Sequence, residues 1–204
     1  MKTLAIECAS EACSVALFDG DRLIAHDYLT LGRGHAEHLV PMIAALPEKG
    51  QADRIVVSRG PGSFTGVRIG IATARALGIA WGAKVESYPT LALVAATARH
   101  AHPDSAISVA MRAGHGEAFV QNFDVEGLPI SEPLSLKPIE AAKACIGELI
   151  AGTMSEEISA MNTGTKAMTT LPDARHLPTM PAEIFSSDLS PAYCRGPDAK
   201  LPGK

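Results

Sequence analysis

The segment RIVVSRGPGSFTGVRIGIATARALGIAW, residues 54–81, joins a strand pattern, a glycine-rich turn and a helix pattern. Residues 54–58 are an apolar run without alternation, as in a parallel strand covered on both faces. Ser63 or Thr65 is placed to cap a helix over residues 67–81. A strand, glycine turn and helix start can hold an anion on free backbone N–H groups. The turn lacks the Gly-Lys-Ser/Thr of a P-loop, so it is not one.

Three strand patterns precede this unit, at residues 3–8, 13–18 and 22–28, with the hairpin signal Asp19-Gly20 between the last two. A helix pattern beginning near Glu37 follows, with apolar residues at i, i+3, i+4 and i+7: Leu39, Met42, Ile43 and Leu46. The order strand–strand–strand–helix–strand–helix is that of ribonuclease-H-like and actin-like folds.

The second half of the chain repeats this order weakly. We expect strands at residues 106–111, 118–124, 128–136 and 158–161, and a helix at 139–150. Prolines interrupt any long element after Gly164. The predicted fold is therefore α/β, an actin-like (ribonuclease-H-like) ATPase fold of two related lobes. The N-terminal lobe is placed at residues 1–100 and an abbreviated C-terminal lobe at 101–204.

Composition and charge exclude several classes of protein. The 204 residues are 47% hydrophobic but only 4% aromatic, so the core is built from small and aliphatic side chains. The net charge of −4 argues against direct binding of tRNA or DNA. There is no CxxC pair, no signal peptide pattern and no apolar window of the ~18 residues that span a bilayer. We expect a cytoplasmic protein with reduced thiols and no membrane contact.

The turn between the first two strands, residues 7–13 (ECASEAC), is where actin-like ATPases and sugar kinases hold metal and phosphate. Those proteins use an Asp and a glycine-containing turn, because side chains obstruct the close approach of backbone to phosphate. Here there is no glycine, and Glu7 and Glu11 would repel a nucleotide. The turn is either a worn phosphate loop or an ordinary hairpin.

His35-Ala36-Glu37-His38 is a second candidate site, because two histidines at i and i+3 lie on one helix face. Zinc peptidases use H-E-x-x-H instead, and no third ligand is obvious here. The alternatives are a metal pair, or histidines that cap the helix, bond a backbone group or meet a partner.

The helix at residues 67–81 is small or apolar over more than half its circumference. One side carries Gly66, Gly70, Ala74 and Gly78. Another carries Ala72, Thr73, Ala76 and Ala80. A helix packed only on its own sheet needs a narrower stripe, so we expect a second surface to cover it. That surface is either the neighbouring helix at residues 37–46 or a helix of another molecule, and the size of the patch favours another molecule. Gly70→Leu or Ala74→Glu should then disrupt association and leave the monomer folded.

Three motifs, GHAEHLVPMI (34–43), GPGSFTGVRIGIATARALG (60–78) and PAYCRGPDAK (191–200), resemble the TsaB (YeaZ) family of actin-like proteins in tRNA threonylcarbamoyladenosine modification. The resemblance covers nearly the whole chain. It implies a homodimer built from the first two helices, pairing with a TsaD-type paralogue that performs the transfer, and a third component, a TsaE-type ATPase. The chain departs from the family at Glu7-Cys8-Ala9-Ser10, which replaces Asp-Thr-Ser, and around Arg112-Ala113-Gly114.

The resulting hypothesis is a non-catalytic subunit that dimerises, activates the TsaD-type transferase and meets tRNA only indirectly. No catalytic residue, metal ligand or cofactor is assigned, and weak nucleotide binding is considered only at a subunit interface. The alternatives are a stand-alone actin-like ATPase or phosphotransferase and a metallopeptidase using His35 and His38. The predicted interface residues are His35, Glu37, His38, Leu39, Met42, Gly66, Arg68, Ile69, Gly70, Thr73, Ala74 and Leu77.

Overall fold

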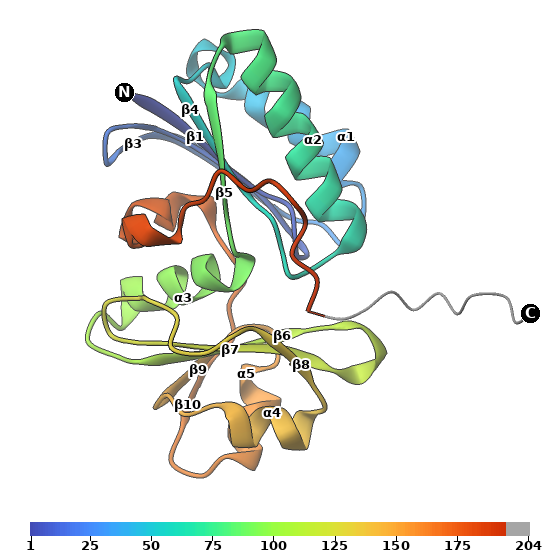
Figure 1. Ribbon diagram of the computed structural model, residues 1–204, viewed down its shortest axis with the longest axis vertical. Helices are drawn as coiled ribbons and strands as arrows, with labels where there is room; N and C mark the ends of the chain where they lie inside the picture. Colours follow the sequence, from blue (N-terminus) through green and yellow to red (C-terminus); the bar gives the residue numbers. More distant parts are fainter. Residues whose placement is uncertain (195–204) are drawn as a thin grey trace, which may run out of the picture.

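The computed structural model describes residues 1–194 and contains two five-stranded mixed sheets, one above the other in Figure 1. The C-terminal part of the motif at 191–200 lies outside the described residues. The first half of the chain forms β1 (Lys2–Glu7), β2 (Ala12–Asp19), β3 (Arg22–Thr30), α1 (His35–Ala45), β4 (Arg54–Ser58), α2 (Phe64–Trp81) and β5 (Lys84–Tyr88). The remainder forms α3 (Thr90–Ala101), β6 (Ile107–Arg112), β7 (Ala118–Phe123), β8 (Leu134–Leu136), α4 (Pro138–Ala144), β9 (Leu149–Ala151), α5 (Ser155–Met161) and β10 (Lys166–Met168).

Both sheets have the same strand order. The first runs β3-β2-β1-β4-β5 and the second, read in the same sense, β8-β7-β6-β9-β10. In each sheet the first three strands are antiparallel and the last two join in parallel. The repeated order confirms the predicted actin-like class with two related halves. No helix within residues 1–194 is long and apolar enough to cross a membrane.

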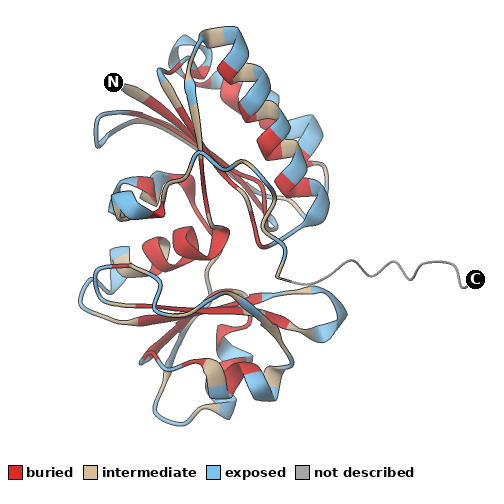
Figure 2. Cartoon of the chain, in the orientation of Figure 1, coloured by how far each residue is buried: buried red, intermediate tan, exposed pale blue. Residues whose placement is uncertain are grey.

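α3 lies between the two sheets and is buried almost all round, as the red helix in Figure 2 shows. Leu91, Leu93 and Val94 are fully buried in a core that contains residues of both sheets. Sequence periodicity does not reveal this helix, because a helix that is apolar on every side carries no amphipathic pattern. The sequence patterns likewise predict no strand at the position of β5.

α2 packs closely on the first sheet through its small residues, which corrects the expectation for that side of the helix. A Cβ on Gly66 would overlap the carbonyl oxygen of Cys8, and one on Gly78 would overlap Val85. Ala74 is fully buried in the same core. The glycines therefore bring α2 against its own sheet, so Gly70→Leu and Ala74→Glu would disturb the monomer itself.

The chain returns to the first lobe after β10. The backbone of Ser186 forms a bridge with Ser87 of β5. The backbone N–H of Ala192 donates to the carbonyl oxygen of Arg59 at 2.7 Å. The division at residues 100 and 101 remains a prediction, but the contacts place this last segment against the first sheet rather than with the second.

Two further expectations in the second half were wrong, and a third was too long, since the strand expected at 128–136 is confined to β8, Leu134–Leu136. The helix expected at 139–150 ends at Ala144, and Leu149–Ala151 is instead the central parallel strand β9. The strand expected at 158–161 lies within α5. In both places apolar residues were assigned to the wrong period, since short apolar runs suit either element.

Gly66→Ala should destabilise the fold. Alanine gains about 1 kcal/mol of helix propensity, but its methyl group meets a backbone carbonyl that side-chain rotation cannot move aside. We expect the free energy of unfolding to fall by about 2 kcal/mol, measured by urea denaturation. Gly70→Ala is the control, because its Cβ meets a methyl group of Val57 at 3.2 Å, which can shift. Equal stability of the two variants would contradict this packing.

Candidate functional site

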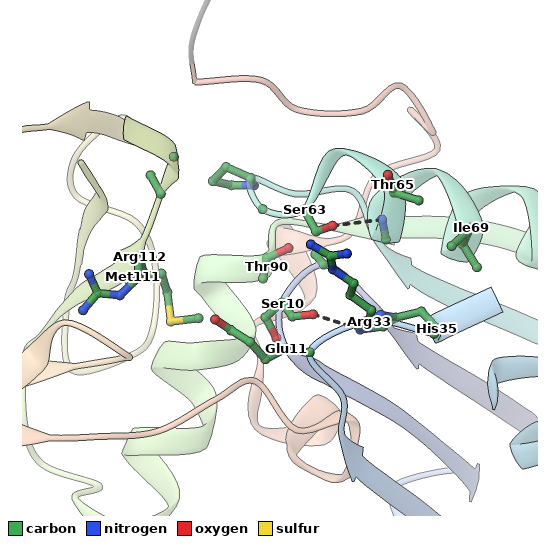
Figure 3. A pocket seen from close by; sticks show the side chains of 18 of the residues that line it. Ser10, Glu11, Arg33, His35, Ser63, Thr65, Ile69, Thr90, Met111 and Arg112 are labelled. Atoms are coloured by element: carbon green, nitrogen blue, oxygen red, sulfur yellow. Dashed lines mark hydrogen bonds between the residues drawn. The ribbon is translucent and has the colours of Figure 1, made fainter. Parts of the chain in front are cut away.

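A cleft of about 660 Å³ lies between the lobes, beside the start of α2 (Figure 3). Its walls come from three loops of the first lobe and from the end of β6 and its following turn in the second. Figure 3 shows Ser10, Arg33, Ser63 and Thr90 on one side and Met111 and Arg112 opposite. The cleft contains exposed Glu11 as well as the exposed cations Arg33 and Arg112, so its charge is mixed.

The glycine turn before α2 packs directly against the backbone of the turn between β1 and β2. The backbone N–H of Ser63 donates to the carbonyl oxygen of Ala9 at 2.7 Å. A Cβ on Gly62 would overlap that same oxygen. The Ser63 side chain caps α2 as predicted, accepting from the N–H of Gly66 at 3.2 Å. These N–H groups already have acceptors, so they are not available to hold an anion.

The two histidines of the 35–38 segment have different surroundings. His35 is buried, and its Nε2 donates to the carbonyl oxygen of Ser10 at 2.9 Å. His38 is exposed at the surface of α1. Within residues 1–194, no group of three or more His, Cys, Asp or Glu side chains could hold a metal ion. The contact of His35 ties the start of α1 to the β1–β2 turn, one of the roles considered for it.

Glu7 is a fully buried carboxyl group at the end of β1. Burial raises the pKa of Glu7 to about 7, against the opposing hydrogen bond from the N–H of Ala9, 2.5 Å from Oε1. The hydroxyl of Tyr88 donates to the neighbouring carbonyl oxygen of Ile6 at 2.8 Å and lies 3.5 Å from Oε2 of Glu7. The expected charge repulsion at this turn therefore comes from Glu11 alone when Glu7 is protonated.

Ser14, His26 and Asp173 lie together but do not form a hydrolytic triad. Nε2 of His26 is 2.8 Å from Oδ1 of Asp173 and 3.5 Å from Oγ of Ser14. A triad requires the two ring nitrogens to serve different partners, whereas here one nitrogen faces both. Oγ of Ser14 also accepts from the N–H of Ala174 at 3.1 Å. The cluster attaches the returning C-terminal segment to β2.

The structure separates the predicted interface residues into two groups. Six are buried within the chain itself: His35, Leu39, Met42, Gly66, Gly70 and Ala74. Burial leaves these six little surface for a partner, although His35 and Gly66 also line the cleft, and their interface role remains a prediction. The other six are exposed or partly exposed: Glu37, His38, Arg68, Ile69, Thr73 and Leu77. For these, interface function remains a prediction.

The remaining exposed residues of α1 and α2 include apolar ones that the sequence prediction missed. Val40 is 54%, Phe64 63% and Ile79 86% exposed. The side of α2 opposite the glycines carried a sequence signal for this exposed surface, because Ala72, Ala76 and Ile79 recur there at helical spacing. We call the exposed residues of the two helices the helix face: Ala36, Glu37, His38, Val40, Pro41, Ala44, Ala45, Phe64, Thr65, Arg68, Ala72, Arg75, Ala76, Ile79 and Ala80.

One end of the helix face carries a cation beside two aromatic rings. The guanidinium of Arg68 lies 3.2 Å from the centre of the Phe64 ring and 5.6 Å from that of Tyr193. The two rings are 6.0 Å apart. Tyr193 belongs to the third sequence motif, so the structure brings the second and third motifs together at the surface.

Glu7→Gln should remove a pH dependence of stability. The folded state keeps the Glu7 proton up to a pKa of about 7, while the unfolded chain releases it near 4.5. The contribution of Glu7 to stability is therefore fully present below pH 4.5 and is lost as pH rises, by about 3 kcal/mol once above pH 7. The test compares urea denaturation of the wild type and Glu7→Gln at pH 5 and pH 8.

Glu11→Gln is the matched control, since Glu11 is an exposed carboxyl on the same turn. It should keep the pH dependence of the wild type. Parallel curves for the wild type and Glu7→Gln would show that Glu7 ionises normally in the folded state.

Residues 30–135, just over half of the chain, match the family model described as TsaD, tRNA N6-adenosine threonylcarbamoyltransferase. The chain is 36% identical over 124 residues to the tRNA threonylcarbamoyladenosine biosynthesis protein TsaB of Escherichia coli, covering 58% of this chain and 53% of the relative. The Bacillus subtilis protein of the same name is 31% identical over 126 residues, covering 58% and 53%. The chain thus spans about half the length of the curated relatives it matches.

Solved structures agree with this assignment. YeaZ from Pseudomonas aeruginosa superposes with a TM-score of 0.73 at 28% identity, over 86% of this chain and 88% of that one. A second Pseudomonas aeruginosa structure, described as similar to peptidase YeaZ, gives a TM-score of 0.75 at 29% identity over the same shares. Within the group that the TsaD model describes, the chain belongs to the TsaB (YeaZ) family.

Proposed function

We propose that this chain is a non-catalytic binding subunit of tRNA threonylcarbamoyladenosine biosynthesis. It forms a homodimer and also pairs with a TsaD-type transferase, which it activates. A TsaE-type ATPase joins that pair. The single observation that carries the proposal is the apolar helix face of α1 and α2, in a chain whose family works in this pathway.

The helix face has the composition of an interface. Among its exposed α2 residues only Arg68 and Arg75 are charged, while Phe64 and Ile79 are large and apolar. Exposed apolar side chains that gather on one face of a monomer mark a contact site. Arginine and aromatic residues are enriched in the buried centres of interfaces, which favours the Phe64–Arg68 pair as an anchor.

The rival hypothesis, an ATPase or phosphotransferase acting alone, needs a phosphate-binding turn at the cleft. The N–H of Ser63 is bonded to Ala9, and the turn between β1 and β2 presents Glu11 to the cleft. Both features oppose a triphosphate there. A metallopeptidase would need His35 as a ligand, but its Nε2 is bonded to a backbone carbonyl. These contacts favour a binding role.

Binding of tRNA is assigned to another subunit. The chain carries 18 basic and 22 acidic residues, a net charge of −4. Affinity for nucleic acid depends on Lys and Arg displacing counterions from phosphates, which a negative chain does poorly. The pair with a TsaD-type paralogue would therefore supply the contact with tRNA through the partner.

Ile79→Asp should weaken association and leave the monomer folded, because Ile79 is 86% exposed and a buried unpaired charge is costly at an interface. We expect the dissociation constant of the homodimer to rise at least about tenfold. Size-exclusion chromatography with light scattering measures this for the chain alone and mixed with the cognate TsaD-type paralogue.

Ile146→Asp is the matched control, because Ile146 is 70% exposed on the second lobe, away from the helix face. It should associate as the wild type does. A wild-type chain that is monomeric and ignores the paralogue would overturn the proposal, and ATP turnover by the pure chain would favour the enzyme hypothesis.

A further inference from the structure

Two cysteines face each other beneath the cleft. Glu7 and Ser14 are the last paired residues of β1 and β2, so Cys8 and Cys13 occupy the next opposed positions at the mouth of the turn. Their Sγ atoms are 3.7 Å apart. Residues 9–12 lie between them, and Ala9 from this stretch lines the cleft.

The other cysteines of the chain have different surroundings. Cys145 is buried in a separate core on the second lobe, where burial raises its pKa to about 11. Burial likewise raises the pKa of Cys194 to about 11. Among the described residues, Cys8 and Cys13 are the one pair of thiols in direct contact. A chemistry that needs two sulfurs at once is therefore confined to this turn.

We propose that Cys8 and Cys13 are a redox-active dithiol, which hydrogen peroxide or a comparably small peroxide converts to an intramolecular disulfide across the β1–β2 turn. The proposal is independent of the helix face and of the partner assigned to it. It names a covalent modification site at the two ends of the turn whose residues Ala9, Ser10 and Glu11 line the cleft.

The reaction follows from the contact between the sulfurs. The hydrogen bond between the two sulfurs lowers the pKa of Cys13 and raises that of Cys8. The Cys13 thiolate attacks one peroxide oxygen, the O–O bond breaks, and the departing hydroxide takes a proton to leave as water. Cys8 then attacks the sulfenic sulfur of Cys13 and the S–O bond breaks, releasing a second water. Two thiols and one peroxide thus give one disulfide and two waters.

Access to the pair selects a small oxidant. Both cysteine side chains are fully buried, and Gly70 of α2 lies against the side chain of Cys8. The cleft reaches Ala9 and Gly66 directly. A peroxide that enters the cleft has only the turn to pass, whereas a bulky disulfide such as oxidised glutathione cannot approach either sulfur in line.

A disulfide between Cys8 and Cys13 would form next to the close contact between the β1–β2 turn and the start of α2. The carbonyl oxygens of Cys8 and Ala9 lie against Gly66 and Gly62, at the start of α2. Bringing the sulfurs from 3.7 Å to bonding distance ties together the two ends of the turn that carries these oxygens. The disulfide would therefore change both the part of the cleft lined by this turn and the packing of α2 on it.

The test treats the full chain with hydrogen peroxide, traps remaining thiols by alkylation in denaturant, and digests with trypsin and a Glu-specific protease. Cleavage after Glu11 separates Cys8 from Cys13, so their fragments stay joined only through a disulfide. We expect that joined product, reversible by dithiothreitol, to form at least about tenfold faster than any modification of Cys145. Oxidised glutathione should give little of it.

Cys145→Ser is the matched control and should leave the joined product unchanged. In Cys8→Ser the product should disappear, and Cys13 should instead be trapped as a sulfenic acid by dimedone. Two outcomes would overturn the proposal: Cys8 and Cys13 both remaining alkylatable while Cys145 or Cys194 is oxidised, or the wild-type pair reacting no faster than Cys145. Both are measured on the wild-type chain and do not depend on a variant folding.

Discussion

The backbone of the β1–β2 turn lies directly against the start of α2, and the rest of the first lobe is arranged around this contact. It requires residues without a Cβ at Gly62 and Gly66, because the carbonyl oxygens of Ala9 and Cys8 occupy that space. Ser63 completes it by donating its N–H to Ala9 and by capping the helix with its side chain. Gly62, Ser63 and Gly66, which resemble an anion-binding turn in sequence, thus pack against the β1–β2 turn instead. This glycine-rich motif therefore favours a structural role over phosphate binding.

The close packing of α2 on the first sheet leaves the opposite side of the helix exposed. Small residues bring the helix onto β4 and β5, so the remaining arc, from Phe64 to Ile79, stands out toward solvent with few charges. One helix therefore has two low-charge sides with different purposes, one that builds the monomer and one that is open to another molecule. The cleft lies at the end of this helix and between the lobes. A change in the turn beneath it would reach both regions, since Cys8, Glu7 and Ala9 belong to that turn.

Local patterns predicted the first lobe well. The run at residues 54–58 has the bounds of β4, and the cap at Ser63 is present. The helix between the lobes was invisible, because Thr90–Ala101 is apolar on nearly every side once both sheets cover it. The second lobe failed for a related reason, since three-residue strands such as Leu149–Ala151 are too short for a period to be read. For the interface, the small residues of α2 predicted a closely packed side, and the structure shows Gly66, Gly70 and Ala74 buried within the monomer.

The sequence by itself determined the strand and helix order of the first lobe, the special turn before α2 and the family resemblance, because each rests on neighbouring residues. Only the tertiary structure decided which residues of α1 and α2 are buried, since burial depends on where the sheet lies rather than on helical spacing. It also decided the state of Glu7 and the pairing of Cys8 with Cys13, which depend on groups brought together across the β1–β2 turn and from β5. A carboxyl group takes a pKa of about 7 only when folding removes its water, and two thiols become a pair only when two strands set them opposite each other.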